Sequence, residues 1–513
     1  MLVKVFGSAV FGVEATTISV EVNTDNGIGY HLVGLPDNAI KESSFRIAAA
    51  LKNNGFALPG KKITINLAPA DLRKEGSAYD LTIAIGILAA SGQIPSQELG
   101  RYVIMGELSL DGQVQPIKGA LPIAIKAQQE GFSGIFIPRQ NAAEAAVVSG
   151  IDVFAVDNLI EVIHFFQGGG QLQPEPPYGG LDDVPQDGEM EYDFSDVRGQ
   201  ESIKRCMEIA AAGGHNMILI GPPGAGKTML AKRLPGILPP MTMQEALETT
   251  KIHSVAGKLK GTGLLRQRPF RCPHHSASAA SIVGGGSFPQ PGEISMAHNG
   301  VLFLDELPEF KRDVLEVMRQ PLEDREVTIT RARFTVTYPA SFMLVASMNP
   351  SPGGHFLDRN TSSAGALMQM ERYMGRISGP LLDRIDIHIE VTPVPFEKLA
   401  EVSRGESSAD IRKRVTRARA VQAERFAALE HINYNAQMGS KQIREFCKAD
   451  EVSMLLLKNA MERLNLSARA YDRILKVART IADLEQADAI GAAHIAEAIQ
   501  YRSLDREGWR AGM

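Results

Sequence analysis

The sequence predicts an α/β protein with a parallel sheet at its centre and a helical region at its carboxyl end. Short apolar runs that are typical of buried parallel strands occur at Met217–Ile220, Val301–Leu304 and Phe342–Ala346. Helical patterns and long insertions separate these runs, as the crossover connections of a parallel sheet require. Beyond about Val394 only helical patterns continue. A sheet-centred core followed by a small all-helical lid is therefore expected.

The region before this core has the pattern of a separate mixed α/β domain. Alternating strand-like runs interleave with Ala-rich helical runs, and a stretch rich in glycine, proline and acidic residues then follows, as in a linker. We predict a first domain at 1–167, a linker at 168–192, a core at 193–394 and a lid at 395–513. The expected lid helices are 409–428, 440–446, 451–464, 468–483 and 492–502.

Composition limits the functional classes. The chain has 513 residues, 44% hydrophobic and 22% charged, with a net charge of -5, so it is not a globally basic nucleic-acid binder, although a local basic channel stays compatible with this charge. Cys206, Cys272 and Cys447 are unclustered and suggest neither a disulfide nor a metal framework. The longest nearly apolar stretch, Leu81–Ala90, is too short to cross a bilayer. We expect a cytoplasmic protein without a membrane partner.

A phosphate-binding loop lies between the first core strand and the next helix. The segment reads Gly-Pro-Pro-Gly-Ala-Gly-Lys-Thr, which is a P-loop. Its backbone N–H groups can surround phosphate oxygens, its lysine can reach the β- and γ-phosphates, and its threonine hydroxyl can hold Mg²⁺. ATP and Mg²⁺ are therefore the expected cofactors. The expected binding residues are Gly221, Pro222, Pro223, Gly224, Ala225, Gly226, Lys227 and Thr228.

Two carboxylates follow the second core strand. Asp305 and Glu306 come directly after Val301–Leu304, which is the Walker B arrangement. Asp305 is expected to order Mg²⁺ with Thr228, and Glu306 is expected to polarise the water that attacks the γ-phosphate.

Further polar residues complete a predicted hydrolytic site. Asn349 follows the third strand, at the sensor 1 position of an AAA+ ATPase, although Asn before Pro also occurs in simple turns. Arg384 lies among small and apolar residues and is expected to reach a neighbouring subunit's γ-phosphate; the alternative is a local ion pair with Asp383 or Asp386.

The lid offers two candidates for a sensor 2 arginine that contacts ATP in cis. Arg469 opens a predicted helix, and Arg473 lies one helical turn further on. An ordinary solvated charge is the alternative for either residue.

Together with further motifs, this set of residues resembles the YifB/ComM family of magnesium-chelatase-like AAA+ ATPases. The resemblance covers nearly the whole chain and rests on the segments Pro273–Ser278, Val283–Gly286, Pro291–Ser295 and Gly300–Phe310. It implies a homohexameric motor that acts on single-stranded or branched DNA. It also implies a branch-migration role when incoming single-stranded DNA is recombined during natural transformation, with recombination proteins as candidate partners.

Two insertions in the core carry the expected DNA contacts. The first, Lys258–His298, has arginines around an aromatic residue, and the second, Arg325–Pro339, alternates like a β-hairpin. Arginines on such elements can follow phosphates without reading sequence, whereas solvated hairpin charge is the alternative. The candidates are Arg266, Arg268, Phe270, Arg271, Arg325, Arg331 and Arg333.

Neighbouring histidines raise the question of a metal site. His274 and His275 lie beside Cys272, but adjacent side chains diverge on an extended segment, and no second ligand pair at zinc spacing is nearby. We expect a structural or ATP-linked role instead. Relatives often carry a cysteine-rich loop after sensor 1, and segment 350–359 here has no cysteine.

The N-terminal domain resembles the Lon protease domain, which has a ribosomal S5-like fold. Ser77 falls where the nucleophile would be, but Leu121 occupies the position of the lysine base and Lys118 comes three residues early. Because an unassisted serine is a poor nucleophile, we expect a scaffold without protease activity. Beside the DNA motor, the alternatives are a protein-remodelling chelatase-type ATPase and, less favoured, an ATP-dependent protease.

Overall fold

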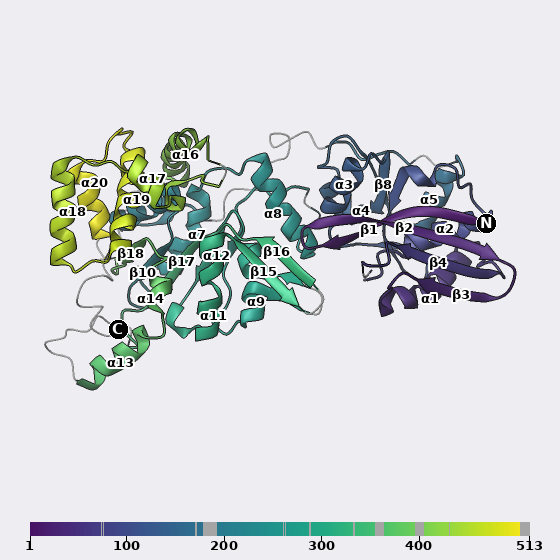
Figure 1. Cartoon of the computed structure of the whole chain (residues 1–513), viewed down its shortest axis with the longest axis horizontal. Helices are drawn as coiled ribbons and strands as arrows, with labels where there is room; N and C mark the ends of the chain where they lie inside the picture. Colours follow the sequence, from purple (N-terminus) through teal and green to yellow (C-terminus); the bar gives the residue numbers. More distant parts are fainter. Residues whose placement is uncertain are drawn as a thin grey trace. The chain divides into compact units, whose positions relative to one another are not determined.

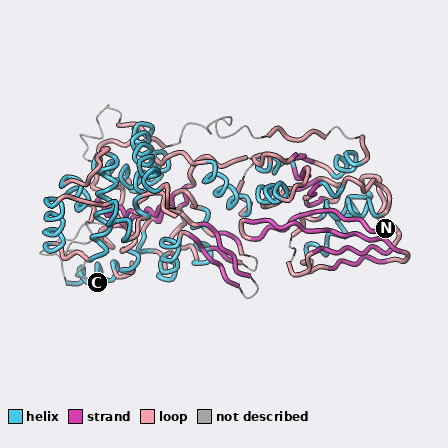
Figure 2. Tube along the Cα trace, turned by 45° about the horizontal axis from the view of Figure 1, so that its top comes forward, coloured by secondary structure: helices cyan, strands magenta, loops and turns pink. Residues whose placement is uncertain are grey.

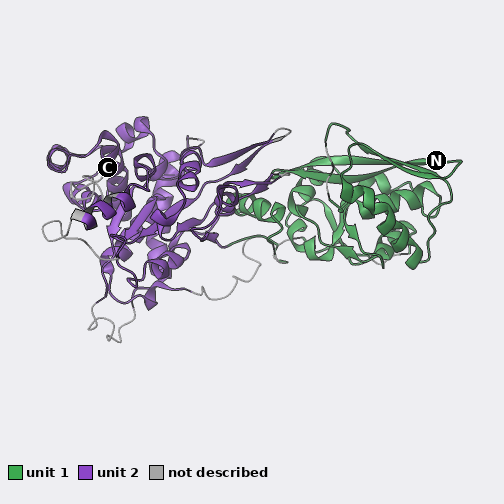
Figure 3. Cartoon of the chain, turned by 90° about the horizontal axis from the view of Figure 1, so that it is seen from below, with its two compact units in different colours: residues 1–186, 243–266 green, residues 187–242, 267–513 purple. Residues whose placement is uncertain are grey.

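The protein folds into two compact units with mixed α/β structure (Figures 1 and 3). The computed structural model describes residues 1–72, 74, 76–169, 172–177, 192–259, 261, 263–286, 289–331, 334–353, 364–394, 405–429 and 431–502. Unit 1 contains residues 1–186 and 243–266, and unit 2 contains residues 187–242 and 267–513. Within the described residues, no helix is both long enough and apolar enough to span a membrane.

Unit 1 is built on a seven-stranded mixed sheet. Its strand order is β3-β4-β2-β1-β5-β8-β9, in which β1, β2 and β4 pair antiparallel and the outer strands pair parallel. The strands are β1 Leu2–Phe11, β2 Glu14–Asp25, β3 Gly29–Val33, β4 Lys62–Ala68, β5 Tyr102–Ile104, β8 Gly134–Pro138 and β9 Asp152–Val156. A short hairpin, β6 Glu107–Leu108 and β7 Val114–Gln115, follows β5.

Helices bury the sheet of unit 1. The apolar stretch that is too short for a membrane is α2, and every one of its residues is buried, so its uniform hydrophobicity reflects a place in the core. The helices are α1 Asn38–Asn53, α2 Asp80–Ala90, α3 Ala120–Gln129, α4 Arg139–Ala145, α5 Leu159–Phe166 and α8 Met243–Val255. Of these, α8 comes from the chain segment that the sequence suggested as part of the core, yet its contacts group it with unit 1.

Unit 2 contains the parallel sheet that the sequence predicts (Figure 2). Its order is β11-β14-β17-β10-β18, and every pair is parallel. The strands are β10 Met217–Ile220, β11 Phe270–Arg271, β14 Val301–Leu304, β17 Met343–Met348 and β18 Ile387–Glu390. Because all strands run the same way, their carboxyl ends share one edge of the sheet and their amino ends share the opposite edge.

Helices and two small hairpins surround this sheet. Around it lie α6 Glu201–Gly213, α7 Lys227–Ile237, α9 Ala279–Val283, α10 Glu293–Met296, α11 Arg312–Val317, α12 Arg319–Asp324, α13 Ala364–Met374 and α14 Gly379–Leu382. The predicted hairpin is confirmed as β15 Glu326–Arg331 and β16 Phe334–Pro339, and a shorter one pairs β12 Gly284–Gly285 with β13 Gln290–Pro291.

The predicted lid helices are also present. They are α16 Ser408–Phe426, α17 Ser440–Phe446, α18 Glu451–Arg463, α19 Ala468–Leu484 and α20 Ala492–Gln500. Their buried side chains share one hydrophobic cluster with the sheet and with α6 and α7. The lid is therefore part of the same compact unit as the core.

Candidate nucleotide-binding site

The P-loop lies at the carboxyl edge of the sheet of unit 2, between β10 and α7. Gly224 and Gly226 adopt positive φ angles of 79° and 85°, which side chains disfavour. A Cβ on Gly221 would lie 2.3 Å from the Val391 carbonyl oxygen, so only glycine fits there. The glycines thus permit the tight strand-to-helix turn that exposes backbone N–H groups.

Lys227 joins the loop to the third strand. Its Nζ donates to the carbonyl oxygens of Gly221 at 2.6 Å and Pro222 at 3.0 Å, and to Oδ1 of Asn349 at 3.1 Å. Burial lowers the pKa of Lys227, while the nearby charges of Asp305 and Glu306 raise it. The structure therefore brings the predicted lysine, both carboxylates and the sensor 1 amide to one place.

The hydroxyl of Thr228 donates to Oδ2 of Asp305 at 2.8 Å. Ser347 donates to the other oxygen of Asp305, and its Oγ accepts the backbone N–H of Glu306 at 3.2 Å. Glu306 adopts a left-handed backbone conformation, with φ 55°. Ser347, on β17, was not expected from the sequence, because a serine inside an apolar strand gives no signal without knowledge of its neighbour.

The arrangement fits a nucleotide with Mg²⁺. A hydroxyl and a carboxylate side by side are oxygen ligands of the kind that Mg²⁺ prefers, and a lysine beside a turn with exposed N–H groups suits phosphate oxygens. Thr228 and Asp305 would hold the ion, and Lys227 and the loop backbone would hold the phosphates. Bound Mg²⁺ would neutralise charge on the phosphates during phosphoryl transfer.

A second contact to Glu306 comes from the turn after β11, the strand that pairs with the Walker B strand β14. His275 is in this turn, and its Nδ1 lies 3.7 Å from Oε2 of Glu306. His274 instead bonds the Ser276 hydroxyl at 2.8 Å, so the two rings have different partners. Among the described residues, no group of His, Cys, Asp or Glu has a metal-binding arrangement.

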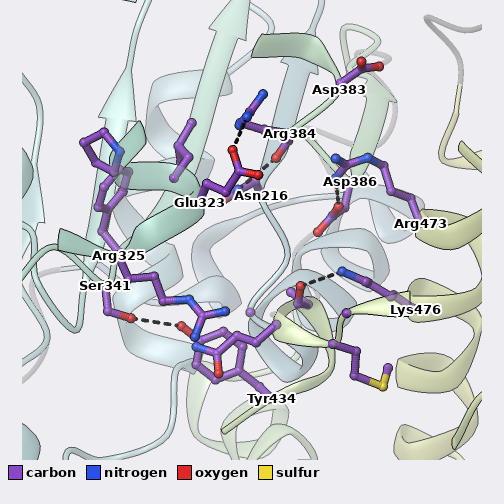
Figure 4. A pocket seen from close by; sticks show the side chains of 18 of the residues that line it. Asn216, Glu323, Arg325, Ser341, Asp383, Arg384, Asp386, Tyr434, Arg473 and Lys476 are labelled. Atoms are coloured by element: carbon purple, nitrogen blue, oxygen red, sulfur yellow. Dashed lines mark hydrogen bonds and ion pairs between the residues drawn. The ribbon is translucent and has the colours of Figure 1, made fainter. Parts of the chain in front are cut away.

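The opposite edge of the sheet holds a charged pocket of ≈ 420 Å³ (Figure 4). Asn216, Ser341 and Asp386, which precede β10, β17 and β18, are among its lining residues. Asn216 links two of these strands, because it donates to the Arg384 carbonyl at 2.9 Å and accepts from Leu344 N at 2.8 Å. The charged lining residues are Arg325, Arg384, Arg469, Arg473, Lys476, Glu323, Asp383 and Asp386.

The arginine predicted to act on a neighbour lies in this pocket. Arg384 pairs with Glu323 and donates to the Pro380 carbonyl at 2.8 Å. The alternative expected from the sequence was an ion pair with Asp383 or Asp386, but the guanidinium of Arg384 pairs with Glu323 instead. Because β10 separates this edge from the P-loop by roughly 13 Å, Arg384 cannot reach the P-loop of its own chain.

The two sensor 2 candidates lie at the same edge as Arg384 and away from the P-loop of their own chain. Arg469 pairs with Asp383 and Arg473 pairs with Asp386 (Figure 4 shows the second pair). Asp386 also accepts from His215 at 3.0 Å, and the pKa of Asp386 is lowered because Arg473 and His215 outweigh its burial. Helix order along the chain does not reveal which edge of the sheet a lid helix faces.

Most candidate DNA contacts in the first insertion have structural partners. Phe270 is part of β11 and stacks on Phe303 with ring centroids 5.9 Å apart, so it is not free to stack on bases. Arg268 donates to the carbonyls of Pro239 and Asn299 at 2.7 and 2.8 Å. Arg271 forms a two-pronged ion pair with Glu293, at 2.6 and 2.8 Å. Arg266 lies in unit 1, is partly buried and has a partner of its own.

In the second insertion, the structure describes two of the three candidate arginines. Arg325 lies at the base of the hairpin, where it lines the pocket and donates to the His431 carbonyl at 2.9 Å. Burial lowers the pKa of Arg325. Arg331 is exposed at the end of β15 and stays a candidate, while Arg333 and the segment 354–359 fall outside the described residues.

In unit 1, Ser77 donates to the carboxylate of Glu107. Leu121, at the position of the Lon lysine, is fully buried in the first turn of α3. Lys118 is exposed and lies against Gly257, since a Cβ on that glycine would be 3.1 Å from Cε of Lys118. These contacts favour the expectation of a scaffold over that of a serine–lysine protease.

Comparison with known proteins identifies relatives over the whole chain. Three magnesium-chelatase family descriptions match: subunit ChlI of Mg-chelatase at residues 20–141, magnesium chelatase subunit ChlI at 193–399, and its C-terminal part at 405–502. The competence protein ComM of Haemophilus influenzae is 46% identical over 507 residues, which is 98% of each chain. The uncharacterized protein YifB of Escherichia coli is 46% identical over 97% of this chain and 96% of its own.

More distant similarity reaches a magnesium chelatase itself. The magnesium-chelatase 67 kDa subunit of Heliobacterium mobile is 26% identical over 210 residues, covering 34% of this chain and 31% of its own. With a P-loop, two strand-end carboxylates and a sensor amide gathered at one sheet edge, and with near full-length identity to ComM and YifB, the chain belongs to the YifB/ComM family of magnesium-chelatase-like AAA+ ATPases.

Proposed function

We propose that this protein is an ATP-hydrolysing motor, assembled as a homohexamer, that drives branch migration of DNA. The observation that carries the proposal is the separation of two half-sites. The P-loop and its carboxylates lie at one edge of the sheet, and Arg384 lies with Arg469 and Arg473 at the other. A complete hydrolytic site then requires a second copy of the chain.

In this arrangement the residues at the carboxyl edge perform the chemistry. Glu306 orients the attacking water and accepts a proton from it. Asn349, at the end of the third strand, holds the same water without adding charge. Lys227 and the P-loop N–H groups stabilise the charge on the phosphates. Arg384 of the neighbouring copy supplies positive charge to the transition state, and it must leave Glu323 to do so.

DNA as the substrate is supported by two observations. The hairpin β15–β16 ends in the exposed Arg331, whose charge can follow a phosphate backbone without reading sequence. The relative from Haemophilus influenzae is named a competence protein, which fits a role in the recombination of incoming single-stranded DNA during natural transformation. ATP and Mg²⁺ are the proposed cofactors, and the cytoplasm is the proposed compartment.

The test is a three-strand junction assay with ATP. The unmodified protein should move the junction, and Lys227→Ala and Glu306→Gln should both stop it, the second while still binding ATP. Arg331→Glu should weaken junction movement and DNA-stimulated ATPase together. Lys441→Glu, which changes the charge equally on an exposed lid residue, should leave both unchanged.

Other outcomes would favour other functions. If DNA does not stimulate the ATPase activity and does not bind to the protein at low salt, the DNA motor is excluded. The protein-remodelling role, which the similarity to a magnesium-chelatase subunit supports, would then be favoured. Casein degradation that is lost in Ser77→Ala would instead favour a protease.

A further inference from the structure

Helix α8 comes from the motor part of the sequence, yet it packs within unit 1. It follows the P-loop helix α7 after only residues 238–242, and the chain returns through residues 267–269 to β11. The first of these connections leads back to the helix that begins with Lys227 and Thr228. The second leads into the strand that precedes His275.

The contacts that hold α8 involve its last turn. Ser254 accepts the backbone N–H of Gly119 at its carbonyl oxygen, 3.2 Å away, and its hydroxyl donates to Oε1 of Glu144, also at 3.2 Å. Just beyond the helix, Gly257 lies against the aliphatic chain of Lys118. Ser254 is 2% exposed, so its polar groups depend on these partners.

Buried hydrogen bonds hold the surface that receives α8. Asn141 holds it by bonding both the N–H and the carbonyl of Ile117 at 2.9 Å. Glu144 is only 4% exposed, and a carboxylate buried so deeply requires hydrogen-bond donors. Helix α8 provides one of them. We call this surface, formed by residues 116–121 and Glu144, the α8 dock.

The α8 dock uses the segment that resembles the lysine segment of Lon. In place of a catalytic base, this segment presents the N–H of Gly119 to α8 and the stem of Lys118 to Gly257, just beyond the helix. A region that catalyses in a protease is here occupied by contacts with another part of the same chain.

We propose that the α8 dock, and not the linker at 168–192, is the mechanical connection through which the N-terminal domain acts on ATP turnover. Docking fixes a helix that residues 238–242 join to the P-loop helix and that segment 256–269 joins to the strand before His275. A change in the N-terminal domain, such as ligand binding, can thereby reach the nucleotide site. The effect on turnover rests on the proposed ATPase function, whereas the docking itself does not.

Docking is tested by cutting the linker. A site for a specific protease is introduced between residues 178 and 191 of the full chain, and the cleaved protein is analysed by gel filtration in 0.5 M salt. We expect the N-terminal fragment to elute with the motor fragment, because α8 belongs to the latter and holds the former. Separation of the two fragments would overturn the proposal, whatever the ATPase activity.

Coupling is tested with Ser254→Phe, which removes the donor to Glu144 and is too large for the dock. We expect its cleaved fragments to separate and its ATP turnover to fall about fivefold, with or without cleavage, because α7 and β11 lose a fixed neighbour. Cleavage alone should leave the turnover of the parent unchanged. Gln244→Phe, on the exposed first turn of α8, is the matched control and should behave like the parent.

The alternatives are distinguishable. Fragments that separate in Ser254→Phe without any change in turnover would overturn the coupling. Fragments that stay together in this variant would overturn the assignment of the α8 dock to the contacts of Ser254. Should the variant fail to fold by circular dichroism, the cleaved parent protein still decides the docking. An inactive parent whose fragments stay together would contradict the proposed function but not the dock.

Discussion

His275 contacts Glu306 from the turn that follows β11, and this contact restrains a carboxylate that the proposed reaction uses as a base. The two side chains are 3.7 Å apart, within reach of an ion pair when the imidazole is protonated. The sequence indicated an ATP-linked or structural role for these histidines without saying which partner they have. Only the parallel pairing of β11 with β14 brings them to the same edge.

Replacement of His275 tests this restraint. In His275→Ala we expect kcat for ATP to fall on the order of tenfold, with KM nearly unchanged, because Glu306 loses orientation while the phosphate contacts remain. His275→Gln should recover part of the loss. His274→Ala, whose ring bonds Ser276, serves as the control in the same steady-state assay. Equal losses in both alanine variants would show that the segment acts only structurally.

Among single residues, those in the motifs were predictable from the sequence and those outside them were not. Lys227, Asp305, Glu306 and Asn349 each follow a strand of one parallel sheet, so strand order alone brings them together. The ion pair of Arg469 with Asp383 was not foreseen, because the two residues are 86 positions apart in the chain. Phe270 was a candidate for stacking on bases because arginines surround it in the sequence, and its two-residue strand is too short to give a strand pattern.

At the level of elements, helices with clear periodicity were the most predictable. The lid helices α16 to α20 and the hairpin β15–β16 lie where their patterns place them. Helix α8 was also visible as a helical pattern, but a local pattern does not state which unit a helix packs against. Its position depends on contacts with Gly119 and Glu144, more than a hundred residues earlier in the chain.

The stability of the α8 dock is expected to depend on pH through Glu144. Burial raises the pKa of Glu144 to about 7, although the hydroxyl of Ser254, the N–H groups of Ala120 and Leu121, and Asn141 act against the rise. A carboxyl whose folded pKa is raised gives stability that is fully present below the unfolded value, near 4.5, and is lost as the pH rises through 7.

We therefore expect the unfolding free energy of Glu144→Gln, relative to that of the parent, to increase as the pH rises from 5 to 8. The increase should be about 3 kcal/mol at most. Glutamine keeps an acceptor for Ser254 and carries no charge. Denaturant unfolding followed by the transition of unit 1 measures the difference. Glu98→Gln, an exposed carboxylate, should show no such gain. A parent and variant that keep a constant difference across this range would contradict the assignment.

At the scale of the whole molecule, the division of one hydrolytic site between two copies can be tested by mixing. Lys227→Ala loses the phosphate-binding half, and Arg384→Ala loses the arginine half. Each should be inactive alone. Mixed in equal amounts, they should recover ATPase activity at about a quarter of the interfaces, where an intact P-loop meets an intact Arg384.

The matched control for this mixture pairs two defects of the same half. Lys227→Ala with Glu306→Gln leaves no interface with a complete carboxyl-edge half, so no activity should return. No recovery in the first mixture would show that each chain completes its own site. Recovery in the control would show that Lys227 and Glu306 do not belong to the same half-site.

The placement of the two halves on opposite edges of one sheet also limits the symmetry of any assembly. In the proposed shared site, the P-loop edge of one copy meets the arginine edge of the next, which in a row of copies is a head-to-tail contact. An open row of such contacts always leaves one P-loop without an arginine and one arginine pocket without a nucleotide. A closed ring uses every half-site, so closing such a row adds a working site without adding a subunit.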